Sequence, residues 1–406
     1  MRVLLVNTLY PPDSEGGAER SVAQLAHGLA EAGVDVTVLA LKADGAAGIE
    51  RKGAVTVWRA PMLNLYWPYD GAARSEVMRH GWHAIEAFGR TMDGVVAEVI
   101  RQAQPDMVHA QVTTGFGTSV TRAARSAGLP VVQTVRDYSL MCARAAMFRQ
   151  GRRCGRRCGD CVLLTTDKKR ASQRAQAWVA VSASLAGAHE AQAYFKGVQG
   201  WVIGNAVTTV KASPRPGFDQ APELVFGLIG RIEPEKGVEV LLQAAMRLGD
   251  GWRLKIAGRG DAAYVATLQR RFDDPRMDWL GQVEADAFYR SVDLVVAPAL
   301  WAEPFGRTAA EAVAQGRGVI VSNIGGLPEA AGDAPFVMQV DPGDVAGLAE
   351  AMQRALDGRE DWRFGAMINS RTPPRWTEAA VVEAHLALYR EVLTKASRTA
   401  AEVSQL

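Results

Sequence analysis

The chain of 406 residues has few cysteines, little net charge and no long apolar run. Four cysteines are too few for a disulfide-built scaffold of this length. No run of roughly 18 apolar residues occurs, so we expect no transmembrane helix. The 46 Lys and Arg residues nearly balance 44 Asp and Glu, which argues against an overall basic field and a nucleic-acid partner. The first residues lack the apolar stretch of a signal peptide, so we expect a cytoplasmic protein.

The composition is that of an ordinary folded protein. Hydrophobic residues make up 48% and charged residues 22% of the chain, which excludes disordered, collagen-like and coiled-coil proteins. At roughly 150 residues per domain, the length indicates two or three domains.

Short apolar runs alternate with helical patterns along nearly the whole chain. Val3–Val6 is a predicted strand, and a helical stripe follows within Ala18–Gly33. Further strands are predicted at Val34–Ala40, Val55–Arg59, Met107–Ala110, Val131–Val135, Val179–Val181, Leu224–Ile229, Arg253–Ala257, Leu294–Ala297 and Gly318–Val321. This order indicates an α/β fold of two doubly wound, Rossmann-like domains that face each other across a cleft.

The domain limits follow from a segment rich in Pro, Gly and Ser around residues 212–218. We predict a first domain at 1–210, a linker at 211–222 and a second domain at 223–375. The amphipathic remainder, 376–406, is predicted to be a helix that packs back on the first domain. Ligands of such sheets bind at the carboxyl ends of the strands, so the loops there are the candidate site.

Two glycine-bearing loops lie at predicted strand ends. Gly16 and Gly17, with Glu19 close behind, precede the first helix, where free N–H groups attract an anion. A plain tight turn would also explain this pair. Arg231 and Lys236 flank the turn before the next domain's first helix, where two cations and a positive helix end suit a diphosphate.

The most specific stretch begins at Glu303 with the sequence Glu-Pro-Phe-Gly, and Glu311 follows eight positions on. Pro304 and Gly306 keep the front irregular, so a helix is expected to start near Arg307 or Thr308. Glu303 would then lie in the loop and Glu311 about one turn inside the helix. Two carboxylates that bind vicinal hydroxyls and a set of free N–H groups that bind phosphate would share one small volume.

These motifs resemble retaining, nucleotide-sugar-dependent glycosyltransferases of family four (glycosyl transferases group 1), which have the GT-B fold. The resemblance covers essentially the whole chain and implies roles for its residues. Arg231 and Lys236 would bind the donor diphosphate, and Glu303 and Glu311 would hold hydroxyls of the sugar and the ribose. The amides of Gly16, Gly17, Phe305 and Gly306 would contact phosphates, with Glu19 supporting the first glycine loop. Cations and a helix dipole would replace a catalytic metal. Domain 1–210 would be the acceptor side and 223–375 the nucleotide-sugar side.

Two positions depart from the family's pattern. Arg136 follows the strand Val131–Val135 where the family usually has His, and the family's His-x-His is His109-Ala110-Gln111 here. Arg136 would pair with a negatively charged sugar or acceptor, or stabilise the phosphate in another way, or mark a catalytically weak paralogue that binds sugar nucleotides. His109 is also explained as an ordinary strand-end histidine.

All four cysteines fall in the segment 142–174: Cys142, Cys154, Cys158 and Cys161. In a cytoplasmic chain such clustering indicates a tetrathiolate site for structural zinc, ahead of an iron–sulfur cluster or two disulfides. Residues 144–174 carry ten basic residues and two acids, a net +8, so the rest of the chain carries −6 of the total +2. Such a loop suits a membrane surface or a lipid-linked or polyanionic acceptor. A solvated cationic loop is the alternative.

The predicted function is retaining transfer of a sugar from a nucleoside diphosphate donor to an acceptor hydroxyl, in polysaccharide, glycolipid or glycoside biosynthesis. The acceptor would be lipid-linked, polyanionic or a small molecule, and the enzyme cytoplasmic or peripheral at the inner face of the membrane. The alternatives are a catalytically weak sugar-nucleotide-binding paralogue and a GT-B phosphorylase or epimerase.

Overall fold

A computed structural model describes residues 1–13, 16–43, 45, 47–208, 215, 223–333, 335–363 and 376–403. The chain forms two compact units. Unit 1 comprises residues 1–147, 155–206 and 378–406, and unit 2 comprises 148–154 and 207–377. The predicted linker at 211–222 lies outside the described residues, Arg215 excepted.

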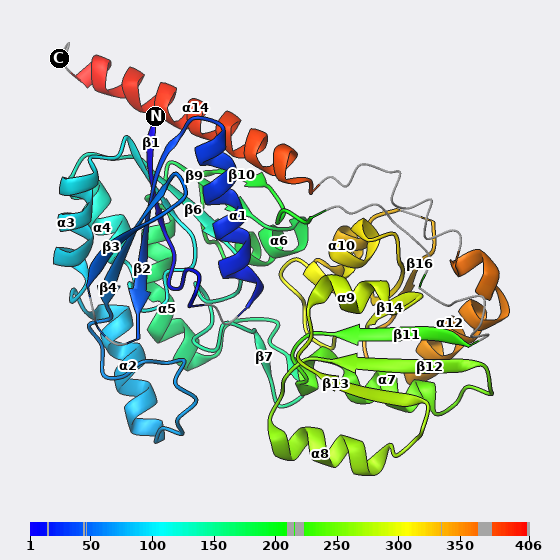
Figure 1. The fold of residues 1–406 in the computed structure, drawn as a ribbon. Coiled ribbons are helices and arrows are strands. Elements are labelled where there is room, and N and C mark those ends of the chain that lie inside the picture. The colour runs from blue at the N-terminus through cyan, green and yellow to red at the C-terminus, as the bar shows by residue number, and fades with distance from the viewer. Residues whose placement is uncertain are drawn as a thin grey trace. The chain divides into compact units, whose positions relative to one another are not determined.

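Unit 1 is built on an eight-stranded sheet of order β10-β9-β6-β5-β1-β2-β4-β3 (Figure 1). Its pairs are parallel apart from β3 with β4. The strands are β1 (Arg2–Val6), β2 (Asp35–Lys42), β3 (Gly48–Lys52), β4 (Val55–Pro61), β5 (Met107–Ala110), β6 (Val131–Val135), β9 (Ala177–Ala180) and β10 (Gln199–Val202). The inner strands are buried on both faces, as parallel strands covered by helices are.

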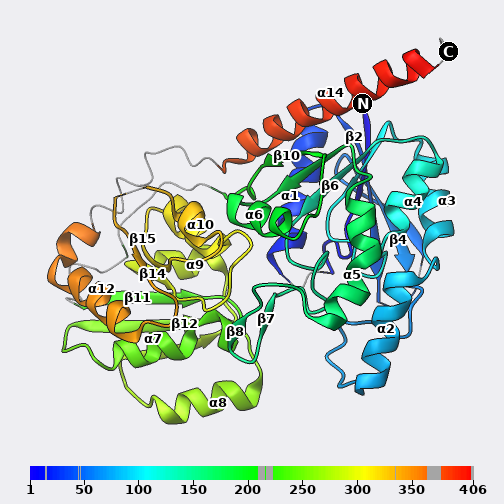
Figure 2. The same cartoon turned by 180° about the vertical axis from the view of Figure 1, so that it is seen from behind.

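Helices cover both faces of this sheet, as Figures 1 and 2 show from opposite sides. One buried cluster joins α1 and α14 to the sheet, and a second joins α3 and α4 to its other face. The helices of unit 1 are α1 (Gly17–Glu31), α2 (Glu76–Phe88), α3 (Asp93–Ala103), α4 (Ser119–Ser126), α5 (Gly159–Ser172), α6 (Ala183–Ala191) and α14 (Glu378–Val403).

The C-terminal helix α14 packs against α1, although more than 340 residues separate the two in the sequence. Gly28 makes the close approach possible, because a Cβ there would lie 2.5 Å from Val382 Cγ2. Leu388 and Tyr389 are fully buried in the same cluster.

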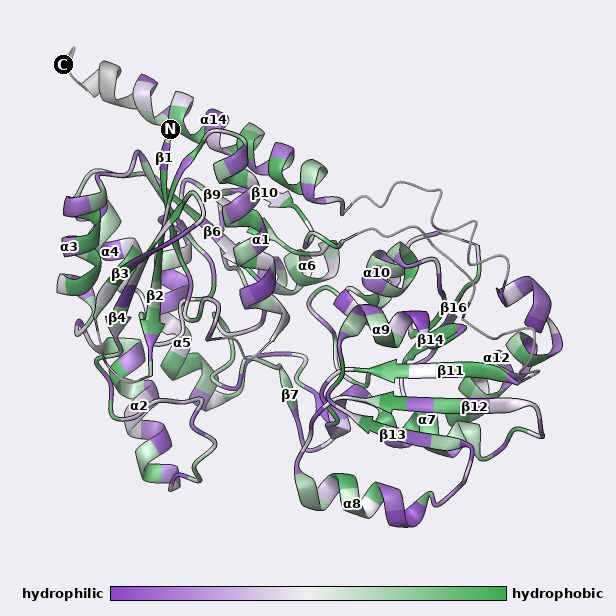
Figure 3. Cartoon of the chain, viewed as in Figure 1, coloured by the Kyte–Doolittle hydropathy of each residue, from purple (hydrophilic) through white to green (hydrophobic). Residues whose placement is uncertain are grey.

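Unit 2 contains a six-stranded parallel sheet of order β13-β12-β11-β14-β15-β16. Its strands are β11 (Leu224–Ile229), β12 (Trp252–Ala257), β13 (Met277–Gly281), β14 (Leu294–Ala297), β15 (Gly318–Ser322) and β16 (Val337–Val340). Its helices are the 3₁₀ turn η1 (Pro234–Lys236), α7 (Val238–Ala245), α8 (Ala262–Arg271), α9 (Ala285–Arg290), α10 (Arg307–Ala314), α11 (Leu327–Ala331) and α12 (Val345–Asp357). Figure 3 shows β11 coloured hydrophobic along most of its length, consistent with its place inside the core.

The predicted α/β class with two doubly wound, largely parallel sheets is confirmed. Several elements escaped the sequence pattern. The edge strand β3 is exposed and hydrophilic, and β7 (Phe148–Arg149) and β8 (Arg152–Arg153) form a two-stranded hairpin too short to have a period. No helix within the described residues is long and apolar enough to cross a bilayer.

Candidate functional site

A pocket of about 410 Å³, its open mouth included, lies at the carboxyl ends of β11 and β14 in unit 2. Its lining includes four predicted site residues, Arg231, Lys236, Glu303 and Gly306. The other lining residues are apolar or small apart from Thr308, whose hydroxyl donates to the carbonyl of Ile229 at 3.3 Å. Two cations, a carboxylate and a helix N-terminus therefore surround one hollow of ligand size.

Glycines shape the walls of this pocket. Gly306 has a φ of +92° and caps the N-terminus of α10, which begins at Arg307 within the predicted range. Gly325 has a φ of +62°, and a Cβ there would come within 2.5 Å of the backbone N and O of Glu303. The amide of Gly326 donates to the Glu303 carbonyl at 2.7 Å. The loop of Glu303 is thus held against a turn that only glycine allows.

Lys236 and Glu303 form an ion pair in the pocket, with their side chains 21% and 17% exposed. Trp301 contacts both of them. Its indole N–H donates to Glu303 Oε1 at 3.2 Å, and the Lys236 ammonium lies 5.0 Å from the centre of its ring. Sequence reasoning missed Trp301, and the only signal for it was an aromatic residue two positions before Glu303.

Arg231 projects into solvent, with 57% of its side chain exposed, and donates to Glu233 Oε1 at 2.8 Å. Burial raises the pKa of Glu233. The positive charge of Arg231 lowers this pKa, and Glu235 raises it further. Arg231 is therefore the more exposed of the two cations at the pocket.

Glu311 does not line the pocket and instead sits inside α10. Its Oε1 accepts from Arg307 Nε at 2.5 Å, and its Oε2 accepts from the Tyr289 hydroxyl at 2.8 Å. Phe305 also does not line the pocket with its ring, which is buried and packs edge-on against Trp376. The predicted amide contacts of Phe305 and Gly306 stay predictions.

In unit 1, the first glycine loop leads into α1. Gly16 is its N-cap, and the carboxylate of Glu19 returns to accept the Gly16 N–H at 2.9 Å. Glu19 is 9% exposed, and its hydrogen bond with the Gly16 N–H is the glutamate half of a capping box at the start of α1. Residues 14 and 15 of this loop lie outside the described residues.

Arg136 lies just after β6 and is held by two neutral amides. Its Nε donates to Gln111 Oε1 at 2.8 Å, and its Nη1 donates to Asn205 Oδ1. His109 is fully buried and bonded to Thr134 and Tyr389. The two departures from the family pattern, Gln111 and Arg136, thus contact each other directly.

Of the four predicted cysteine ligands, Cys142, Cys158 and Cys161 belong to unit 1 and Cys154 belongs to unit 2. Within the described residues, no group of three or more His, Cys, Asp and Glu is arranged to hold a metal ion. Cys142 and Cys161 form a buried pair. A hydrogen bond from the Cys161 thiol, aided by backbone N–H groups, lowers the pKa of Cys142 to about 5. Cys158 lies beside Cys161 but is exposed, and Cys154 is half-buried. The zinc site has no support from this geometry.

The basic segment is less uniformly exposed than its sequence indicates. Lys168 is buried and its Nζ lies 3.1 Å from Glu86 Oε2, so it does not belong to a cationic surface. Arg157 is half-buried, with its guanidinium over the Tyr194 ring. The exposed cations are Arg144, Arg149, Arg152, Arg153, Arg156, Arg170 and Arg174.

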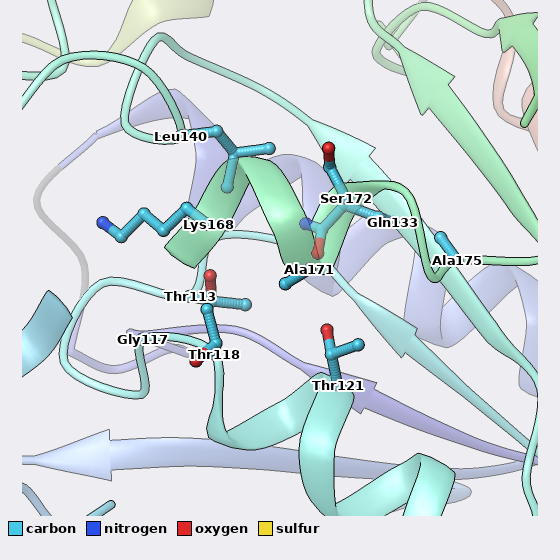
Figure 4. Close-up of a pocket in the computed structure, with 10 residues that line it drawn as sticks. All are labelled: Thr113, Gly117, Thr118, Thr121, Gln133, Leu140, Lys168, Ala171, Ser172 and Ala175. Carbon is cyan, nitrogen blue, oxygen red and sulfur yellow. The ribbon is translucent and has the colours of Figure 1, made fainter. Parts of the chain in front are cut away.

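A second pocket, of about 320 Å³ with its open mouth included, lies in unit 1 near α4 and α5 (Figure 4). Threonine and serine hydroxyls, the Gln133 amide and the stem of Lys168 line it. Figure 4 shows the Lys168 ammonium pointing away from Thr121 and Ser172. Lys168 is the one residue of this lining that belongs to the ten basic residues of the segment 144–174.

The two doubly wound, largely parallel sheets of this chain, with glycine-bearing loops at their strand ends, have the architecture of the GT-B class of proteins. The family model described as Glycosyl transferase 4-like domain matches residues 16–206, and the model described as Glycosyl transferases group 1 matches residues 223–358.

A 42.6 kDa protein in the cps region of Klebsiella pneumoniae is 29% identical over 329 residues, which are 81% of this chain and 87% of the relative. Among solved structures, sucrose-phosphate synthase from Thermosynechococcus elongatus has a TM-score of 0.76 at 19% identity, covering 97% of this chain and 99% of that one. Anabaena HepE in complex with UDP has a TM-score of 0.68 at 18% identity, covering 96% and 100%. The chain belongs to the glycosyltransferases of group 1, and it is a glycosyltransferase with the GT-B fold.

Proposed function

We propose that the protein transfers a sugar, with retention, from a nucleoside diphosphate donor to an acceptor hydroxyl in polysaccharide, glycolipid or glycoside biosynthesis. The observation that carries the proposal is the unit 2 pocket, where Arg231, Lys236, Glu303 and Gly306 surround one hollow. The solved relative with bound UDP supports a nucleotide donor, and the relative in a cps region supports a glycan product.

In this proposal the donor diphosphate lies against Lys236 and Arg231. Their positive charges, with the N–H groups of Phe305 and Gly306 at the start of α10, offset the charge that develops on the leaving phosphate. Gly16 and Gly17 contribute amides from unit 1, and Arg136 contributes a further cation. Chain residues alone neutralise the leaving group here, so the transfer needs no divalent metal.

Carboxylates hold the hydroxyls. Glu303 accepts from hydroxyls of the transferred sugar, which means that the donor must open the Lys236–Glu303 ion pair and give each residue a new partner. Glu311 accepts from the ribose hydroxyls, oriented by Tyr289 and Arg307. Both roles use carboxylates as bidentate acceptors of vicinal hydroxyls.

The acceptor attacks the face of the sugar from which the leaving group departs, so the anomeric configuration is retained. The bond between the anomeric carbon and the phosphate oxygen breaks, and the acceptor oxygen bonds to the same carbon on the same face. The acceptor proton passes to the departing phosphate oxygen, so no carboxylate serves as a covalent nucleophile.

A screen of nucleotide sugars tests the proposal. We expect one donor class to bind and to be turned over, with α-configured donor giving α-linked product by NMR. Lys236→Met should lower kcat by about a hundredfold, because it removes a charge at the leaving group. Lys395→Met, at an exposed position of α14, is the matched control.

Four outcomes would contradict the proposal. Inverted product would overturn retention. A requirement for inorganic phosphate would indicate a phosphorylase, and an altered sugar on the intact nucleotide an epimerase. Tight binding with neither hydrolysis nor transfer, and no gain from Arg136→His, would indicate a non-enzymatic sugar-nucleotide-binding protein.

The exposed arginines of residues 144–174 supply a second element of the proposal, a contact with an anionic membrane surface that carries a lipid-linked acceptor. Val162 and Leu163, at the start of α5, are 43% and 63% exposed close in sequence to Arg156. Apolar side chains beside cations favour the interface of a bilayer. Sedimentation with phosphatidylglycerol vesicles should exceed that with phosphatidylcholine vesicles and fall with salt. Equal binding to both vesicles would refute the contact.

A further inference from the structure

A chain of buried polar side chains joins Arg136 to the C-terminal helix α14. Arg136 Nε lies 2.8 Å from Gln111 Oε1, and Gln111 Nε2 lies 2.9 Å from His109 Nε2. His109 Nδ1 lies 2.6 Å from the hydroxyl of Tyr389. Gln111, His109 and Tyr389 are at most 2% exposed, and all four residues belong to unit 1.

The chemistry of Arg136 fixes the orientation of the Gln111 amide, and the contacts of the His109 ring then indicate its tautomer. A guanidinium only donates, so the oxygen of the Gln111 amide must face it and the NH₂ must face His109. Gln111 Nε2 lies 2.9 Å from His109 Nε2 and 3.2 Å from Nδ1, and the Thr134 hydroxyl lies 2.7 Å from Nε2. The single lone pair of Nε2 faces these two donors, so we assign the acceptor role to Nε2. The ring proton is left on Nδ1, which donates to the Tyr389 oxygen.

The surroundings keep both ends of the chain in these protonation states. Burial, with the nearby His385 and Arg136, holds the pKa of His109 well below its usual range, so the ring is neutral. Burial raises the pKa of Tyr389, so the phenol stays protonated at neutral pH. His385 cannot take the place of Tyr389, because its Nδ1 donates to the Val381 carbonyl within α14.

We infer that Gln111, His109 and Tyr389 are positioning residues that hold the Arg136 guanidinium at the carboxyl end of β6. The inference rests on the proposed function, in which Arg136 faces the donor. A long, flexible arginine acts on a reacting phosphate only if it is held in one orientation beforehand. Gln111 and Asn205 supply that orientation directly, and α14 supplies it through Tyr389 and His109.

The two departures from the family pattern, Arg136 and Gln111, therefore act together. Arg136 needs an acceptor at position 111, and the amide oxygen of Gln111 provides it without adding charge. Tyr389, 280 residues from His109 in sequence, then fixes the ring against which the Gln111 amide packs.

Removal of the Tyr389 hydroxyl tests the inference. Tyr389→Phe keeps the buried ring, and we expect kcat for sugar transfer to fall about five- to tenfold with little change in KM for the donor. In an Arg136→Ala background the same substitution should change kcat by less than about twofold, because the positioned group is gone. Tyr194→Phe is the matched control, since Tyr194 is equally buried and its hydroxyl donates to the Leu140 carbonyl at 2.8 Å.

A role in stability alone would give equal losses in both backgrounds, and that result would overturn the inference. An effect of Tyr194→Phe as large as that of Tyr389→Phe would overturn it as well. Replacing Gln111 by Leu should reproduce the Tyr389→Phe phenotype, since it cuts the same chain one link nearer to Arg136.

A second readout does not depend on activity. Nitrogen-15 NMR of histidine-labelled protein, with His109→Gln to assign the signal, should show the ring proton of His109 on Nδ1. Arg136→Ala should release that preference. A proton on Nε2 in the unaltered protein would overturn the inference whatever the activity. Absence of sugar transfer from every donor would instead refute the proposed function, while the NMR experiment would still decide the direction of the hydrogen-bond chain.

Discussion

Replacing Lys168 by methionine should destabilise unit 1, because it leaves the carboxylate of Glu86 buried without its cation. The two side chains are 7% and 6% exposed, and Lys168 Nζ also donates to the Ser139 carbonyl at 3.3 Å. Methionine keeps most of the apolar stem that packs in the core. The substitution therefore isolates the charge from the packing.

The pKa of Glu86 gives the size of the effect. Burial raises it, but the Lys168 charge and hydrogen bonds from His83, Lys168 and Gly115 prevail and lower it from 4.5 to about 2. That lowering corresponds to about 3 kcal/mol in favour of the carboxylate. Breaking a buried ion pair by removing one partner costs on the order of 3–5 kcal/mol. We expect Lys168→Met to lose about 3 kcal/mol of unfolding free energy.

Hydrogen exchange of the α2 and α5 amides in urea would report on unit 1 separately from unit 2. The double variant Glu86→Gln with Lys168→Met should recover much of the loss, because two neutral side chains replace the lone charge. Lys169→Met is the matched control at the next, half-buried position.

The contribution of Glu86 to the stability of unit 1 should depend on pH. The folded pKa of Glu86 is lowered, so its contribution is fully present above pH 4.5 and is lost as the pH falls toward about 2. Lys168→Met should remove this acid-dependent part. A loss below about 1 kcal/mol, the value of an exposed pair, would refute the buried ion pair and restore Lys168 to the cationic surface that its sequence context predicts.

Three further predictions concern other parts of the chain. Burial lowers the pKa of His189 from 6.5 to about 4, so the unfolding free energy should fall by about 3 kcal/mol as the pH drops from 6.5 to 4. Urea unfolding of His189→Gln should lack this decline, and the same pH dependence in the variant would contradict the prediction. Gly325→Ala should lower kcat by at least about tenfold, because a Cβ would push the backbone of Glu303 out of place, and a fully active variant would show that the loop adapts. Thiol titration of the native protein should find two reactive groups, Cys154 and Cys158, whereas four protected thiols with one zinc per chain would restore the zinc site.

Local sequence patterns determined many elements of the fold and singled out the loops that line the unit 2 pocket. The runs at Met107–Ala110, Val131–Val135, Leu224–Ile229 and Leu294–Ala297 became strands with those same bounds, because fully buried parallel strands need continuous apolar residues. The start of α10 was readable from Pro304 and Gly306, since both act on the backbone locally.

Tertiary structure alone decided how the polar residues are used. Glu86 and Lys168 are 82 residues apart, and nothing in a cationic segment distinguishes the lysine that is buried from its exposed neighbours. Likewise, the sequence does not indicate that Trp301 lies beside the Lys236–Glu303 pair, or that Tyr389 contacts His109, 280 residues away. The physical reason is that burial of a polar group depends on finding its partner, and the partner is supplied by packing between distant segments, which sequence periodicity does not encode.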